Sequence, residues 1–227
     1  MTGSATRIDH LVIAAHTLEQ GVAWCESTLF VTPQAGGQHP LMGTHNRLLK
    51  IETPQFIRAY LEIIAIDPQA ADPRRRRWFD LDDARLREAI RETPRLVHFV
   101  ASCDRAAVAS SALDSLGIDR GPQLAAGRET QDGPLRWKIS VRDDGQRLFY
   151  GCLPTLIEWD GRHPAESLPD SGLKLLSLTA THPRPDDLFM AYRAIHLEQV
   201  GIEAGAPNLS ARLMTPLGEV TLDSAGV

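Results

Sequence analysis

The sequence predicts an α+β protein made of two tandem βαβββ modules and a partial module at the C-terminus. Strand-like and helix-like segments follow one another in the same order twice, and each repeat carries a histidine in its first strand and a glutamate in its last. The histidines, His10 and His98, are 88 residues apart, and the glutamates, Glu62 and Glu158, are 96 apart. An ordinary loop insertion accounts for the difference.

The first module spans residues 7–67. Its strands are short apolar runs or alternate between apolar and polar residues, and Thr17 supplies an N-cap for a helix. A cluster of glycines with Pro40 is typical of a loop, although a short strand fits the same place in the order. We expect strands at residues 7–15, 44–51 and 60–66, a helix at residues 18–29, and the loop or short strand at residues 36–43.

A charged connector with one helix, residues 68–94, leads to the second module, residues 95–162. There the pattern restarts with an apolar strand, a helix that Gly117 ends, and further strands. The C-terminal unit, residues 173–227, has a strand, a helix and a hairpin, but no histidine in its first strand. We therefore assign it a structural or interface role.

Glu62 lies in the middle of an apolar run, Tyr60-Leu61-Glu62-Ile63-Ile64-Ala65-Ile66, that is bounded by Asp67 and Pro68. A carboxylate held inside a sheet core costs several kcal/mol unless it is paired or binds a metal. We therefore expect other parts of the chain to supply partners for Glu62.

The composition argues against several functions. The formal net charge of −5 is unlike that of a general nucleic-acid binder, and no apolar run is long enough to span a membrane. The first seven residues are polar and show no signal peptide, and the three cysteines lack the number and spacing of a disulfide framework or a Cys-based zinc site. A cytoplasmic location is the default expectation.

The repeated order and several short motifs resemble the vicinal oxygen chelate superfamily, which includes glyoxalase I, bleomycin-resistance proteins and extradiol dioxygenases. The closest likeness is to its glyoxalase-like domain group, and it covers about residues 7–162. The motifs are Asp9-His10-Leu11-Val12, Gly36-Gly37 with His39, Gly43-Thr44-His45-Asn46-Arg47-Leu48, Tyr60-Leu61-Glu62, the strand of His98, and Leu156-Ile157-Glu158-Trp159-Asp160.

The resemblance implies the glyoxalase/bleomycin resistance/dihydroxybiphenyl dioxygenase fold, in which the sheets of two modules curve into a cleft. In members with a metal, the first and last strands of each module supply the ligands. Position by position, this points to His10, Glu62, His98 and Glu158. Two imidazoles and two carboxylates suit a divalent ion such as Zn, Ni, Co, Mn or Fe.

The same resemblance favours some reaction types over others. Extradiol dioxygenases match three of these positions and do not use the fourth, Glu62, as a ligand, so the set favours a lyase or isomerase, with a dioxygenase second. The substrate would be a small molecule with adjacent oxygens. A metal polarises its carbonyl, and a carboxylate takes a proton from carbon. By resemblance, Glu158 is the first choice for that base and Glu62 the second.

His45 and Asn46 follow the glycine-rich stretch and are candidates for substrate contacts. An exposed His45 and a turn-closing Asn46 account for the pattern equally well.

Each predicted ligand also has an ordinary structural explanation. A single histidine on a strand is more often a hydrogen-bonded core residue than a ligand. Glu62 could pair with Arg47 or Arg58, and Glu158 could end a strand in solvent. Four such residues at matched places of a repeat make the metal hypothesis the stronger one.

Two other classes of function stay open. A metal-free protein could sequester a small molecule, as bleomycin-resistance proteins do, with Trp24, Trp137 and Trp159 lining its cleft. An inactive member could serve as an assembly partner. A small molecule is the expected partner, and neither nucleic acid nor a membrane is expected. We expect a site within one chain, with the C-terminal unit as the place where a homodimer would form.

Overall fold

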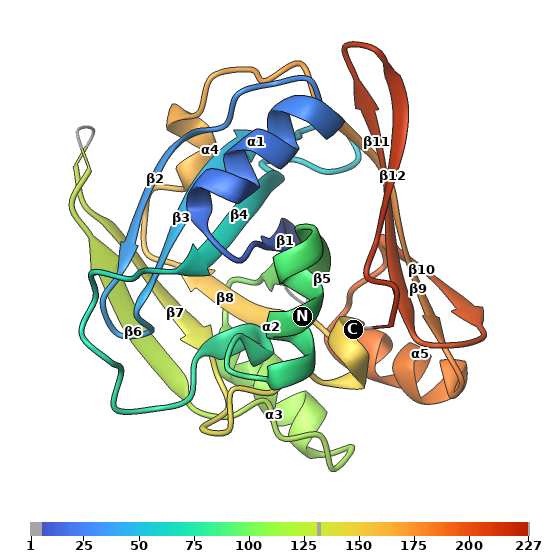
Figure 1. The fold of residues 1–227 in the computed structure, drawn as a ribbon. Coiled ribbons are helices and arrows are strands. Elements are labelled where there is room, and N and C mark those ends of the chain that lie inside the picture. Colours follow the sequence, from blue (N-terminus) through green and yellow to red (C-terminus); the bar gives the residue numbers. More distant parts are fainter. Residues whose placement is uncertain (1–5, 131–132, 227) are drawn as a thin grey trace.

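The computed structural model of the protein describes residues 6–130 and 133–226. An eight-stranded sheet is flanked by helices and by a separate four-stranded sheet, so the predicted α+β class and fold are confirmed (Figure 1). Within the described residues, no helix combines the length and the apolar character needed to cross a bilayer.

The order β, α, β, β, β occurs twice in the large sheet, as predicted. The first half contains β1 (Arg7–Ala14), α1 (Leu18–Thr28), β2 (Gln34–His39), β3 (Thr44–Lys50) and β4 (Tyr60–Ile66). The second half contains β5 (Arg95–Ser102), α3 (Ala106–Asp114), β6 (Gln123–Arg128), β7 (Leu135–Ser140) and β8 (Thr155–Trp159).

A 3-10 helix (Phe149–Gly151) lies inside the second half, between β7 and β8, and the remaining elements connect the halves or follow them. A short 3-10 helix (Trp78–Asp80) and α2 (Ala84–Glu92) lie between the halves. After the second half come α4 (Pro164–Ser167), β9 (Lys174–His182), α5 (Pro185–Ala194), β10 (Val200–Ala204), β11 (Asn208–Thr215) and β12 (Gly218–Asp223).

The large sheet has the strand order β2-β3-β4-β1-β5-β8-β7-β6, so the halves meet where β1 runs antiparallel to β5. The sheet curves strongly, and its two edge strands, β2 and β6, come close together (Figure 1). A Cβ atom on Gly37 of β2 would lie only 2.0 Å from Nη1 of Arg128 on β6. The curvature therefore brings residues from opposite edges of the sheet into one concave space.

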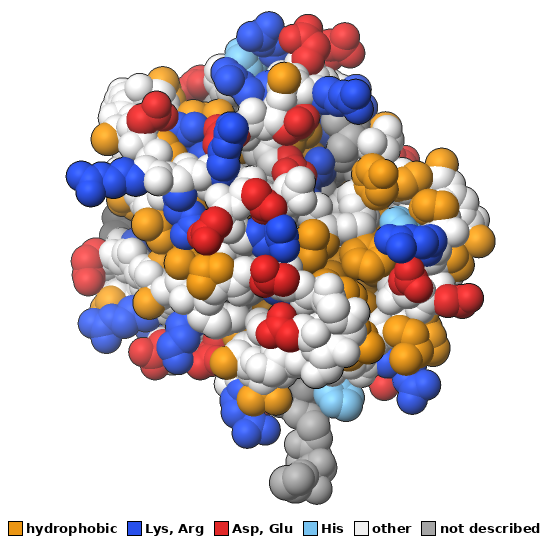
Figure 2. All heavy atoms as spheres, turned by 90° about the horizontal axis from the view of Figure 1, so that it is seen from below, with side chains coloured by type: hydrophobic (Ala, Val, Ile, Leu, Met, Phe, Trp, Pro, Cys, Tyr) orange, Lys and Arg blue, Asp and Glu red, His pale blue; other side chains and the backbone are white. Residues whose placement is uncertain are grey.

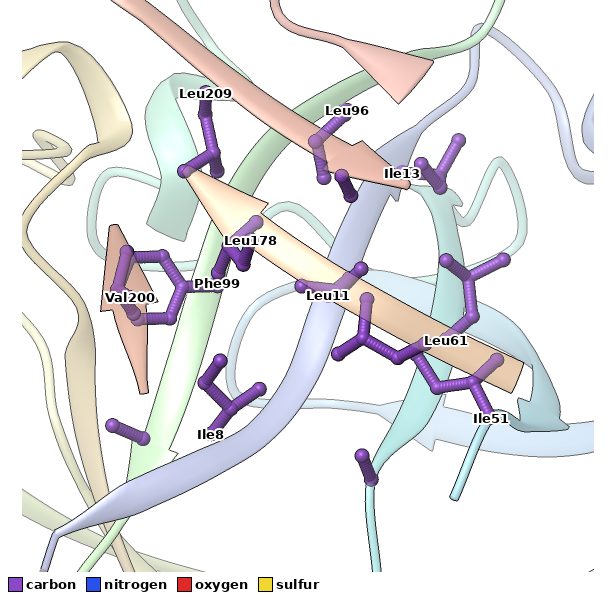
Figure 3. Packing of buried hydrophobic residues seen from close by; sticks show 14 of the residues in the cluster. Ile8, Leu11, Ile13, Ile51, Leu61, Leu96, Phe99, Leu178, Val200 and Leu209 are labelled. Carbon is purple, nitrogen blue, oxygen red and sulfur yellow. The ribbon is translucent and has the colours of Figure 1, made fainter. Parts of the chain in front are cut away.

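Alternation along the strands separates two layers of side chains. On β1, Leu11 and Ile13 belong to the layer on the outer face, whereas Val12 and Ala14 belong to the layer on the concave face. The outer layer also includes the C-terminal sheet, and Figure 3 shows Leu178 of that sheet in the same cluster as side chains of the large sheet. Burying an apolar side chain of this size contributes about 2 kcal/mol. The C-terminal unit therefore covers one face of the large sheet.

The connector between the halves fills part of the concave face. Phe79 and Asp80 have φ angles of 59° and 58°, a left-handed turn that puts Trp78 and Phe79 among the buried concave residues. Asp80 anchors this turn because its N–H donates to Gly145 O and its carboxylate accepts from Arg147. A left-handed residue other than glycine costs about 1 kcal/mol or more, which the burial of two aromatic rings offsets.

For the glycine-rich stretch at residues 36–43 the sequence allowed a loop or a short strand. Its first half is strand, since β2 runs to His39, and its second half is a turn. Gly36 is needed there for close approach: a Cβ would lie 2.0 Å from Oδ1 of Asn46 and 2.5 Å from its backbone oxygen. Such an approach, and not a turn, explains a glycine inside a strand.

The molecular surface carries both signs of charge. On the face that Figure 2 shows, basic and acidic side chains alternate, and hydrophobic side chains gather toward one side.

Candidate functional site

A pocket opens on the concave face between the two halves of the large sheet. It is narrow: the cavity itself has a volume of about 30 Å³, and it lies within a hollow of about 420 Å³ that includes open solvent. Polar side chains form its centre and aromatic rings form most of its walls. The polar side chains are His10, His39, Asn46, Glu62 and Arg128, and the aromatic ones are Tyr60, Trp78, Phe79, Trp137 and Trp159.

Glu62 lies at the centre of the polar group, and only 5% of its surface is exposed. Asn46 donates a hydrogen bond of 2.5 Å to Oε1. The Nε2 atom of His10 is 3.6 Å from Oε2, and Nε2 of His39 is 4.0 Å from Oε1. The structure thus brings His10 and Glu62 together, as the sequence predicts, and surrounds the carboxylate with polar groups.

His10 is oriented by the residue that precedes it. Asp9 Oδ1 lies 2.7 Å from Nδ1 of His10. Neighbouring residues of a regular strand point to opposite faces, but the pairing of β1 with β5 contains a bulge between Ile8 and His10. The bulge turns Asp9 so that its carboxylate reaches the imidazole, and Nε2 of His10 is left facing Glu62.

Asp9 is fully buried and ionised. Burial by itself would raise its pKa, but hydrogen bonds from His10 and His163 outweigh that effect and hold the pKa well below the usual range. Trp159 Nε1 and His163 Nε2 both contact Oδ2, at 2.9 and 3.0 Å. Because Asp9 accepts, Nδ1 of His10 must carry the hydrogen. The sequence reasoning missed Asp9 and His163; an acidic residue directly before a predicted site histidine was the available signal for Asp9.

His39 belongs to the site, although the sequence reasoning did not place it there. It ends β2, is buried, and its Nδ1 lies 3.0 Å from Oγ1 of Thr44. Burial, with Arg128 and His10 acting in the same direction, lowers its pKa to about 4 despite the opposing effect of Glu62. His39 is therefore neutral near pH 7. The sequence also allowed a short strand at residues 36–43. That alternative would have placed His39 opposite Thr44, inside the cleft.

The two predicted substrate contacts lie on different sides of β3. Asn46 lines the pocket, where its Oδ1 accepts from the N–H of Gly37 while its amide donates to Glu62. His45 lines a different hollow, beside Glu19 on α1. Because adjacent strand residues alternate, only Asn46 faces the site, and the structure does not bring His45 into it.

His98 is part of the core and not of the pocket. It is fully buried, its Nδ1 lies 3.0 Å from Gly151 O, and its Nε2 accepts from the N–H of Thr155 at 3.1 Å. Burial and the nearby Arg120 and Arg147 lower its pKa well below the ordinary value. Both ring nitrogens of the neutral imidazole are thus occupied, and neither faces Glu62.

Glu158 is likewise outside the site, on the outer face of β8. Ile157 and Trp159 line the pocket, so the side chain between them points the other way. Its carboxylate accepts from the N–H of Ala106, the first residue of α3, and from Nζ of Lys138. Glu158 therefore caps a helix that has no N-cap side chain of its own.

The register of strand pairing explains why the repeat did not predict the position of Glu158. Val12 of β1 pairs with Glu62 of β4, and the matching Val100 of β5 pairs with Thr155 of β8. Thr155, three residues before Glu158, is thus the counterpart of Glu62.

The predicted four-residue metal site does not fit the geometry. Only His10 and Glu62 of the four share the pocket, while His98 is bonded in the core and Glu158 lies on the outer face. Among residues 6–130 and 133–226, no cluster of three or more His, Cys, Asp or Glu side chains has metal-binding geometry.

Comparison with known proteins places the chain among others of this fold. The sequence pattern of a family described as a glyoxalase-like domain matches residues 8–196, more than four fifths of the chain. The resemblance predicted from the sequence is confirmed by this match. No curated protein matches the chain significantly.

Solved structures share the fold at low identity. A hypothetical protein from Staphylococcus aureus has a TM-score of 0.57 and 12% identity, covering 96% of this chain and 85% of that one. The Mn(II)-bound glyoxalase from Novosphingobium aromaticivorans has a TM-score of 0.48 and 9% identity, covering 96% and 82%. A variant of Streptomyces coelicolor methylmalonyl-CoA epimerase in complex with 2-nitronate-propionyl-CoA has a TM-score of 0.40 and 22% identity, covering 70% and 99%. At these identities the likeness concerns the fold alone.

Proposed function

This chain belongs to the glyoxalase-like domain family, and we propose that it is an enzyme of the lyase or isomerase type that moves a proton on a small organic molecule. One observation carries the proposal. Glu62 is a buried carboxylate at the centre of an open, aromatic-walled pocket, with imidazoles on both sides. A carboxylate placed at such a position is suited to general acid–base catalysis.

In the proposed reaction, Glu62 removes a proton from a carbon next to a carbonyl group. The C–H bond breaks, its electron pair passes into the carbonyl system to form an enolate, and the proton is held by the carboxyl group. His10 Nε2 lies 3.6 Å from Oε2 of Glu62. It can take the proton from the carboxyl group or return the proton to a different atom of the substrate. Asp9 fixes Nδ1 of His10 as the protonated nitrogen, which leaves Nε2 for this transfer.

No step is assigned to a divalent metal. Of the four predicted ligands only His10 and Glu62 line the pocket; His39 lines it as well, and within residues 6–130 and 133–226 no three such side chains have metal-binding geometry.

Hydrogen–deuterium exchange tests the proposal without knowledge of the physiological product. Small 2-oxo and 2-hydroxy acids and their esters would be incubated with the protein in D₂O and followed by NMR. We expect exchange at carbon for at least one compound and its loss in Glu62→Gln. Glu158→Gln is the matched control, because that carboxylate lies on the outer face. Equal exchange by the wild type and Glu62→Gln would refute the role of Glu62.

The aromatic walls favour a second function, the binding of a small molecule without turnover. Trp137 and Trp159 line the pocket with ring centroids 5.4 Å apart and ring planes tilted by 50°, and together they offer an apolar surface. A compound that quenches their fluorescence but shows neither exchange nor conversion would favour a sequestering protein over an enzyme.

A further inference from the structure

Arg128 supplies a positive charge in the pocket, and no side chain of the described residues forms an ion pair with it. It ends β6 and lines the same pocket as Glu62. Its Nη1 atom is buried, and it has no hydrogen-bond partner among the described residues. Glu62 is held by Asn46 and faced by two histidines, and no ion pair joins it to Arg128. The pocket therefore contains a cation and a carboxylate that do not neutralise each other.

Arg128 as a whole is partly exposed, but its Nη1 atom is out of contact with solvent. A buried donor that lacks a partner is destabilising, and one on a charged group more so. The indole N–H of Trp78, another wall residue, is also buried and unpaired within the described chain. Two residues that line the pocket therefore each carry a buried donor with no partner among the described residues. A ligand with anionic oxygens would satisfy them.

Gly37 makes the room that Arg128 occupies. A Cβ on Gly37 would lie 2.0 Å from Nη1 and 2.9 Å from Cδ and Cζ of Arg128. Gly37 does not have a positive φ angle, so no backbone strain requires glycine there. The absence of a side chain at this position lets the guanidinium of one edge strand pack against the other edge strand.

We propose that the substrate is a small organic acid and that Arg128 binds its carboxylate. The carbon that gives up its proton then lies between Arg128 and Glu62. A guanidinium recognises a carboxylate through two parallel N–H···O hydrogen bonds, which fixes both the position and the orientation of the bound acid. The anchored end then directs the C–H bond toward Glu62, while the aromatic walls contact the rest of the molecule. This inference rests on the proposed proton-transfer function and names its substrate class.

The test compares oxamate, a small acid that cannot lose a proton from carbon, with its neutral isostere oxamide. Binding is measured by tryptophan fluorescence, since three tryptophans line the pocket. We expect oxamate to bind at least about tenfold more tightly than oxamide, and Arg128→Gln to remove that preference. Arg128→Lys, which keeps the charge but not the paired donors, should restore only part of it. The matched control is Arg136→Gln, because Arg136 is exposed on the adjacent strand β7.

A second variant tests the proposal even if the arginine variants fail to fold. Gly37→Ala would displace only the flexible end of Arg128, and we expect it to weaken oxamate binding while thermal unfolding stays close to that of the wild type. Equal affinity for oxamate in the wild type, Arg128→Gln and Gly37→Ala would overturn the proposal. Failure of the proton-transfer function would look different: Glu62→Gln would retain exchange activity, while the preference for oxamate and its loss in Arg128→Gln would persist.

Discussion

Asp9 and His10 are neighbours in the chain and hydrogen-bonded to each other, with 2.7 Å between Oδ1 and Nδ1. A regular strand would put their side chains on opposite faces, and the bulge in β1 is what allows the contact. Two further donors contact the same carboxylate: Trp159 at the end of the second half, and His163 in the segment that follows. The orientation of His10 therefore depends on residues about 150 positions away.

Replacing Asp9 tests this orientation. Asp9→Asn keeps the shape but removes the charge, so Nδ1 of His10 no longer has an anionic acceptor. We expect proton exchange to fall by roughly tenfold to a hundredfold while oxamate binding is retained, because Arg128 is unchanged. His163→Gln is the comparison, since it removes one donor to Asp9 but leaves the Asp9–His10 contact in place. An Asp9→Asn protein with wild-type exchange would show that His10 needs no such support.

The buried His39 predicts a loss of stability in mild acid. Its pKa in the folded protein is about 4, against an ordinary value of 6.5. Between these values the unfolded chain binds a proton that the folded protein does not, so the free energy of unfolding falls as the pH is lowered. Urea denaturation at pH 7.5 and pH 5 should show a decrease about 2 kcal/mol larger for the wild type than for His39→Gln. Equal decreases would contradict the depressed pKa.

His98 should matter for stability and not for chemistry. His98→Leu has a similar volume, but it leaves the N–H of Thr155 and the carbonyl of Gly151 without partners in the core. The expected loss is about 2–4 kcal/mol in urea denaturation, with exchange per folded molecule near that of the wild type. A stable variant without exchange would instead indicate that His98 takes part in catalysis.

The two adjacent glycines of β2 should respond differently to alanine. At Gly36 the added Cβ would lie 2.5 Å from the backbone oxygen of Asn46, which cannot move without shifting β3. We expect Gly36→Ala to cost about 1–3 kcal/mol of stability and to disturb Glu62 through Asn46. Gly37→Ala meets only a flexible side chain, so its change in stability should stay below about 1 kcal/mol. Thermal denaturation of both variants measures the difference.

Removal of metal ions separates the present proposal from the four-ligand prediction. Proton transfer by Glu62 and His10 uses side-chain groups alone, so exchange should survive dialysis against EDTA. Activity that disappears with EDTA and returns with one equivalent of a divalent ion would restore a metal-dependent mechanism. Elemental analysis of Glu62→Gln beside the wild type would then show whether the ion is held at this site.

The sequence alone determined the fold class and the repeated order of elements, and it singled out His10 and Glu62 as candidates, which the structure places in one pocket. These follow from local information: apolar periodicity shows strands and helices, and a carboxylate inside an apolar strand needs partners.

Only the tertiary structure decided which residues join that pair. Register separates Glu158 from Glu62, because a shift of three residues along β8 moves a side chain to the opposite face. A single bulge brings Asp9 to His10, and sheet curvature brings Arg128 of one edge strand across Gly37 of the other. Each of these depends on pairings between segments far apart in the chain, which hydrophobic patterning does not encode. The site is therefore built on a fold that the sequence predicts, from contacts that it does not.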